Sequence, residues 1–183
     1  MDWAVSWGAS PYAETVKSIA TDAAGNIFVT GDFRNTVDFD PGSAVVNMTS
    51  IGNQDMYVSK FDAAGNFLWA RQIGGTGAVI NPVSLKLDAT GNIYLAGYYL
   101  GYADFDPGPG VYQLTNFGNY DIFVCKLGPS GSFVWAQHYG DQPDEHAQDL
   151  VVDAAGNVYL AGFFSYFVNF GGGNFVANNG SHD

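Results

Sequence analysis

The stretch Asp22-Ala23-Ala24-Gly25-Asn26-Ile27-Phe28-Val29-Thr30-Gly31 occurs three times in the chain, with small changes, and decides its fold. The second copy occupies residues 88–97 and the third occupies residues 153–162, so the spacing is 66 and then 65 residues. Self-similarity at a fixed period is the sequence signature of a repeat protein, in which each repeat is one supersecondary unit.

Two further markers keep the same register. The dipeptide Trp3-Ala4 returns at residues 69–70 and 135–136, and the segment Asp55-Met56-Tyr57-Val58-Ser59-Lys60 returns at residues 121–126. Three independent markers in one register exclude a chance repeat.

Each repeat contains two predicted β-hairpins. Residues 83–88 and 92–97 are apolar runs joined by a turn that starts with Asp88 and has glycine at position 91, as in a type I turn followed by a bulge. Residues 121–127 and 132–138 form the second pair, joined by a Gly-Pro-Ser-Gly turn. The repeat is therefore a sheet of four antiparallel strands.

Such a sheet is apolar on both faces and cannot stand alone. Burying one large side chain contributes about 1.5–3 kcal/mol, and radial stacking of neighbouring sheets buries both faces at once. The predicted fold class is all-β, with β-propeller blades of four strands and a repeat of 66 residues. The chain is one partial propeller over residues 1–183, and its expected parts are the fourth strand of a preceding blade at 1–15, blades at 16–72 and 83–138, and the first two strands of an unfinished blade at 148–183.

Three blades are too few to close a ring, since propellers typically use about four to eight. An unfinished blade also exposes an unpaired sheet edge, which natural sheets avoid. Two interpretations stay open: the chain is part of a longer propeller, or several copies complete their blades on one another.

The repeated strings resemble the bacterial SBBP-type β-propeller repeat, and the resemblance covers essentially the whole chain. It is carried by the stretch quoted first, by the Asp55–Lys60 marker with the Phe-Asp-Ala-Ala-Gly-Asn that follows it, and by Leu68-Trp69-Ala70. The resemblance implies a propeller fold and a secreted or cell-surface location. It brings no catalytic motif, and the Asp-Phe-Asp-Pro-Gly insert at residues 38–42 resembles a variant found in part of the family.

Composition limits the partners. A formal charge of −12 repels phosphate backbones and anionic membranes, so nucleic acid is excluded as an expected partner. No stretch reaches the length of an apolar membrane span, so no membrane insertion is expected. The start of the chain lacks the features of a signal peptide, so an export signal is expected to be cleaved or upstream. The single cysteine, Cys125, is expected to be a buried core residue.

Binding sites favour variable loops on a rigid scaffold. The connections between the second and third strands, and from one blade to the next, are long and variable and are expected on one face of the propeller. The first kind holds Asp38 and Asp40, and one repeat later Asp104 and Asp106. Alternating carboxylates resemble the start of a calcium loop, which makes calcium the one cofactor suggested. The alternative is an Asp-capped turn that seats Phe39, Phe105 and Phe170 in the blades.

The last blade-to-blade connection is the most acidic segment of the chain. Its Asp141, Asp144, Glu145 and His146 are candidate ligand-binding residues, for a metal or a cationic ligand, and the alternative is a solvated acidic loop. No nucleophile elbow or phosphate loop appears, so catalysis is not expected. The expected function is a secreted or surface module that binds or scaffolds a protein or glycan partner. The alternatives are a self-assembling structural protein and a polysaccharide hydrolase or lyase.

Overall fold

A computed structural model describes residues 14–141 and 144–164, together with Ala4, Ser6 and the backbone of two short strands. The expected N-terminal strand at residues 1–15 lies mostly outside the described residues, as does the expected seat of Phe170. The described elements are all strands and pair antiparallel, which confirms the all-β fold of propeller blades. The described part of the chain has no helix with the length and apolar character of a membrane span.

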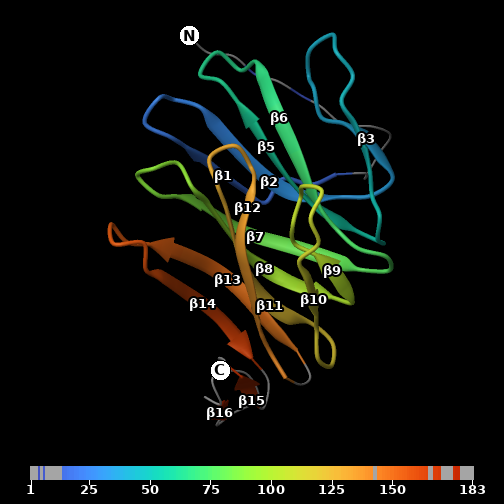
Figure 1. Cartoon of the computed structure of the whole chain (residues 1–183), viewed down its shortest axis with the longest axis vertical. Coiled ribbons are helices and arrows are strands. Elements are labelled where there is room, and N and C mark those ends of the chain that lie inside the picture. Colours follow the sequence, from blue (N-terminus) through green and yellow to red (C-terminus); the bar gives the residue numbers. More distant parts are fainter. Residues whose placement is uncertain are drawn as a thin grey trace.

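Three sheets follow one another along the long axis of the molecule (Figure 1). The first has the order β1 (Ser18–Thr21), β2 (Ile27–Phe33), β5 (Asp55–Phe61) and β6 (Phe67–Ile73). The second has the order β7 (Val79–Leu87), β8 (Ile93–Leu100), β11 (Asp121–Leu127) and β12 (Phe133–Tyr139). The third contains β13 (Glu145–Val152) and β14 (Val158–Phe164). We call them the first, second and third blades.

The first strands of the second and third blades begin earlier than predicted. β7 begins at Val79 and β13 at Glu145, whereas the sequence placed these starts at residues 83 and 148. In both strands a β-bulge interrupts the pairing, between Pro82 and Ser84 and between Ala147 and Asp149, and the ladder resumes beyond it. A bulge admits a residue that cannot pair, so the strand continues where the sequence pattern breaks.

The long connections inside the blades contain small hairpins that the sequence analysis treated as loops. These hairpins pair β3 (Thr36–Asp38) with β4 (Asn47–Thr49), β9 (Tyr102–Asp104) with β10 (Gln113–Thr115), and β15 (Phe167–Asn169) with β16 (Phe175–Ala177). Strands of three residues are too short to show an alternating pattern, so they left no signal in the sequence.

The repeated Asp-x-x-Gly-Asn string makes a self-contained turn. Oδ1 of Asp22 accepts the backbone N–H of Asn26 at 2.9 Å, and Oδ2 accepts the Asn26 side-chain amide at 2.8 Å. Gly25 has a φ of 82°, a left-handed conformation that favours glycine. The same bonds recur in the turns that begin at Asp62, Asp88 and Asp153. The motif that reveals the repeat therefore has a structural role.

The blades are held together face to face. Phe28, Met56 and Val58 of the first blade form one buried cluster with Leu95 and Phe123 of the second. The first strands also touch at the inner edge, where the Ser84 hydroxyl donates to Asp149 at 2.6 Å and the Leu85 N–H donates to Ser18 at 3.1 Å. This is the stacking expected of propeller blades, and the sheets do not close into a ring.

Candidate functional site

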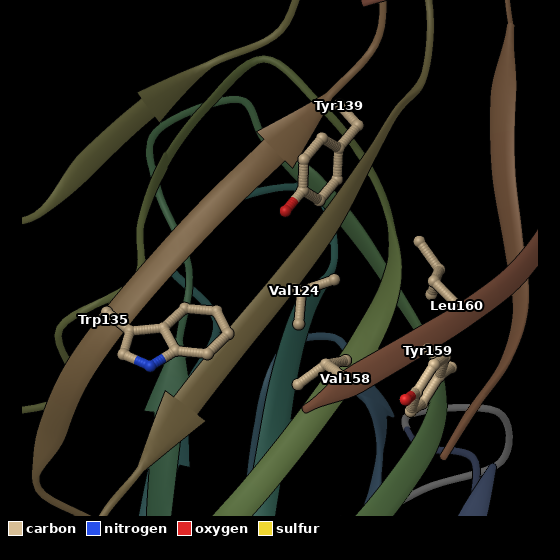
Figure 2. A pocket seen from close by; sticks show the side chains of 6 residues that line it. All are labelled: Val124, Trp135, Tyr139, Val158, Tyr159 and Leu160. Carbon is tan, nitrogen blue, oxygen red and sulfur yellow. The ribbon is translucent and has the colours of Figure 1, made fainter. Parts of the chain in front are cut away.

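A hollow lies along the third blade. A cavity of about 450 Å³ opens between the outer strands of the second blade and β14. It is lined by Val124, Trp135, Tyr139, Val158, Tyr159 and Leu160. Figure 2 shows Val158 on β14 turned toward Val124 on β11, with Trp135 and Tyr139 on the neighbouring strand. We call this cavity the blade groove.

At the junction of the first and second blades, the surface that corresponds to the blade groove is covered. There the corresponding wall, Val58, Trp69 and Ile73, is covered by β11 and β12 of the second blade. Phe123, Cys125 and Leu127 project from β11 into that junction and are fully buried. The groove therefore has the shape left by a hairpin like β11–β12.

The edge of strand β14 is the second part of the candidate site. β2 pairs with β5, and β8 pairs with β11, whereas β14 pairs only with β13 among the described strands. Over residues 158–162 no described strand lies on its other side, and such an edge offers a row of backbone N–H and C=O groups to another strand. The groove and the edge together are complementary to an extended segment with apolar side chains at alternate positions.

The structure corrects the place of the predicted acidic site. Glu145 and His146 are the first residues of strand β13, so they are not loop residues. Asp144 makes a β-bridge to Tyr120, and Asp141 lies exposed at the end of the second blade. The four residues remain close in the chain, but the blade separates them into buried and exposed members.

His146 belongs to an aromatic cluster at the junction of the second and third blades. Its ring stacks on Tyr98 at 4.0 Å between centroids and on Phe163 at 4.9 Å, and Tyr120 lies edge-on at 5.5 Å. Burial lowers the pKa of His146, and the Asp144 charge opposes this shift. Burial therefore favours the neutral imidazole, which packs between the rings of Tyr98 and Phe163.

Glu145 has a different environment. Its side chain is fully buried, and among the described residues neither carboxylate oxygen has a hydrogen-bond partner of normal geometry. Burial and then the Asp121 charge raise the pKa of Glu145 to about 7, with the Asp141 backbone amide opposing the rise and the charges of Asp144 and Asp141 adding to it. A carboxyl group with this pKa is partly protonated at neutral pH.

Asp121 is the partner that sequence reasoning missed. It was recognised only as a repeat marker, yet it is fully buried beside Glu145. Its Oδ2 accepts the Phe117 N–H at 3.1 Å and lies 3.1 Å from Nδ1 of His138, while Oδ1 has no partner among the described residues. The Tyr99 hydroxyl, also buried, likewise has none. The signal for the pair was the exchange of Ile80 for Glu145 between repeats.

The Asp-Phe-Asp-Pro-Gly segments form capped turns. Oδ1 of Asp38 accepts the N–H groups of Asp40 and Val46, and Oδ1 of Asp40 accepts that of Gly42. Asp104 and Asp106 repeat this arrangement. Phe39 and Phe105 are fully buried, as the turn interpretation expects. Calcium at these four carboxylates stays a prediction, and among the described residues no group of three or more His, Cys, Asp or Glu side chains has the arrangement of a metal site.

Comparison with known proteins agrees with the fold. Residues 68–98 match SBBP, a β-propeller repeat, which confirms the resemblance seen in the sequence. The chain is 24% identical over 190 residues to an uncharacterised WD repeat-containing protein of Acanthamoeba polyphaga mimivirus. The aligned region covers 88% of this chain and 13% of that protein. It is 26% identical over 149 residues to the regulatory protein FlaEY of Caulobacter vibrioides, covering 81% of this chain and 15% of that protein. The chain thus spans less than a sixth of either relative, and the likeness supports a binding or scaffold module at the level of the repeat.

Proposed function

We propose that these SBBP-type blades form a secreted or cell-surface module that binds or scaffolds a protein partner and carries no catalytic activity. The partner that fits is a β-hairpin of this same repeat type, which pairs with β14 and fills the blade groove. The SBBP resemblance and the acidic composition support the location. Fractionation of the native cells tests it, and a cytosolic protein would contradict it.

The blade groove carries the proposal. Its apolar lining matches the inner side of β11, where apolar side chains occur at alternate positions. Addition of a strand to an exposed sheet edge is a general mode of peptide recognition, in which backbone hydrogen bonds give affinity and side-chain pockets give specificity. At the junction of the first and second blades, the equivalent surface packs against strands of the same chain, which supports this mode of docking.

The structure favours a protein over a sugar as the partner. The groove is lined by aliphatic and aromatic side chains and has no carboxylate or amide in its lining. The acids that could serve glycan chemistry, Asp121 and Glu145, have no exposed surface. A sugar ring cannot reach them, so a polysaccharide hydrolase or lyase activity is not part of the proposal.

A synthetic hairpin tests the docking. We would titrate the chain by calorimetry with a peptide of residues 121–139 that carries serine at position 125, as the first blade does at Ser59. Saturable binding is expected. A control peptide with serine also at positions 123 and 127 lacks the apolar side chains that enter the groove, and it should not bind.

Two matched variants locate the binding. Leu160→Asp places a charge in the groove and should abolish binding, whereas Val134→Asp changes an exposed side chain outside the lining and should leave it intact. Circular dichroism checks that both variants keep the strand content of the parent. Equal binding by Leu160→Asp, or none by the parent chain, would overturn the proposal, and so would retention on a glycan array in place of the peptide.

A further inference from the structure

Four buried polar atoms without partners gather at the junction of the second and third blades. They are Oδ1 of Asp121, both carboxylate oxygens of Glu145 and the hydroxyl of Tyr99. Buried polar groups in folded proteins are nearly always hydrogen-bonded, and an exception requires an explanation such as an ion or ordered water. We call this group of three side chains the junction acid cluster.

No lysine or arginine balances the charge of the cluster; its basic neighbour is His138, with Nδ1 at 3.1 Å from Oδ2 of Asp121. Its two carboxylates are fully buried, and Asp141 and Asp144 add negative charge beside them. All six Lys and Arg side chains have contacts elsewhere: Lys17, Lys86 and Lys126 pair with Asp32, Asp149 and Asp88, Lys60 and Arg71 lie over the rings of Phe28 and Trp69, and Arg34 binds Gln54. A buried pair of like charges is costly unless a proton or a cation joins it.

Gly140 packs directly against the two carboxylates. A Cβ at this position would lie 2.5 Å from Oδ1 of Asp121 and 2.9 Å from Oε2 of Glu145. The two oxygens are therefore at most about 5.4 Å apart, close to the span of two oxygens that each lie about 2.3–2.6 Å from one ion. A side chain at position 140 would collide with both carboxylates.

At the junction of the first and second blades, the corresponding aspartate has hydrogen-bond partners and no second acid beside it. There Asp55 corresponds to Asp121 and is satisfied by the N–H groups of Ile51 and Gly52 and by the Gln72 amide, at 2.7, 3.0 and 2.6 Å. Ile80 occupies the place of Glu145 and is fully buried. The fold therefore does not need a second acid here, and Glu145 is an addition specific to the second junction.

We propose that Asp121 and Glu145 bind one hard divalent cation of the Ca²⁺ class, which clamps the third blade to the second. Oxygen ligands from two carboxylates match the preference of such ions, with water completing the coordination shell. Asp121 comes from β11 and Glu145 from β13, so the ion joins two blades. His138 holds the outer oxygen of Asp121 and positions its carboxylate.

Several polar groups surround the cluster. Besides the two ligands, they are His138 and Tyr99 from the second blade, His146 on the neighbouring aromatic cluster, and Asp141 and Asp144 from the connection. Burial and the Asp121 charge raise the pKa of the Tyr99 hydroxyl, so it stays protonated.

The test is urea unfolding of the whole chain at pH 8 with Ca²⁺ or with chelator. An ion that binds only the folded state raises the folding equilibrium constant tenfold for each tenfold rise in free Ca²⁺ above its dissociation constant. We expect this dependence in the parent chain and none in Glu145→Ile, which copies the junction of the first and second blades. The control Asp62→Asn removes a carboxylate charge from the turn between β5 and β6 and should keep the full effect.

Direct binding is measured in parallel with Tb³⁺, a luminescent substitute for Ca²⁺. Tyr99 lies in the cluster and should sensitise the emission, which Glu145→Ile should abolish and Asp62→Asn should not. The proposal is overturned if Ca²⁺ leaves the parent chain unchanged at pH 8, if the effect survives in Glu145→Ile, or if Asp62→Asn removes it. Circular dichroism of Glu145→Ile establishes that lost binding is not lost folding.

Discussion

Replacement of Glu145 by isoleucine should change how the stability of the chain depends on pH. The folded pKa of Glu145 is about 7, above its ordinary value of 4.5, because the side chain is buried and Asp121 lies beside it. Between pH 4.5 and 7 the folded state therefore holds up to one more proton than the unfolded state. Stability falls as pH rises through this window, because deprotonation leaves a charge in a site that disfavours it.

The magnitude follows from the size of the shift. Each tenfold change in proton affinity corresponds to about 1.4 kcal/mol, so the rise from 4.5 to about 7 costs about 3 kcal/mol of folding free energy above pH 7. Isoleucine at this position has no charge to bury and already fits the corresponding site as Ile80. Relative to the parent, Glu145→Ile should gain about 2.5 kcal/mol between pH 5 and pH 8.5, since part of the penalty is already present at pH 5.

The assay is urea unfolding of both chains from pH 5 to 8.5 with chelator present, so that no cation screens the pair. The difference between the chains isolates Glu145, since groups such as His146, whose lowered pKa makes stability rise with pH, are common to both. Glu145→Gln serves as a second variant of the same shape without the charge. A parent-to-variant difference that stays constant over this range would refute the reasoning.

Three further predictions address packing. Gly140→Ala places a Cβ 2.4 Å from the Asp121 carboxyl carbon, and urea unfolding should report a loss of about 1–3 kcal/mol; an unchanged midpoint would contradict the close approach. Phe105→Ala should cost about 3–5 kcal/mol because the ring is fully buried, whereas Val111→Ala, at 77% exposure, should change the same unfolding midpoint little; equal losses would contradict the role of the phenylalanine. Cys125 is fully buried and burial raises its pKa, so its reaction with a thiol reagent should follow global unfolding, and rapid labelling of the native chain would contradict this.

Several features of the candidate sites were foreseeable from the chain alone. His138 and Gln72 stand at the same position of successive repeats, and both side chains bind the aspartate that starts the third strand of their blade. The burial of Cys125 also followed from its place in an apolar strand. In these cases one repeat predicts the environment of the next, because residues at the same position of two repeats have the same backbone environment.

Other features depended on contacts that a periodic pattern does not contain. Glu145 and His146 were assigned to a loop because the bulge after Ala147 interrupts the alternation of the strand. The blade groove was not foreseen, since it exists only where side chains of β12 face β14 across a junction.

The sequence by itself determined the strand order within each blade and the turns that join the strands, because these depend on residues close together in the chain. Only the tertiary structure decided which side chains of different blades meet, since stacking brings together Asp121 and Glu145 from separate repeats. The reason is physical: the turns are closed by local hydrogen bonds, whereas the burial of a charge is set by a neighbouring sheet that covers it.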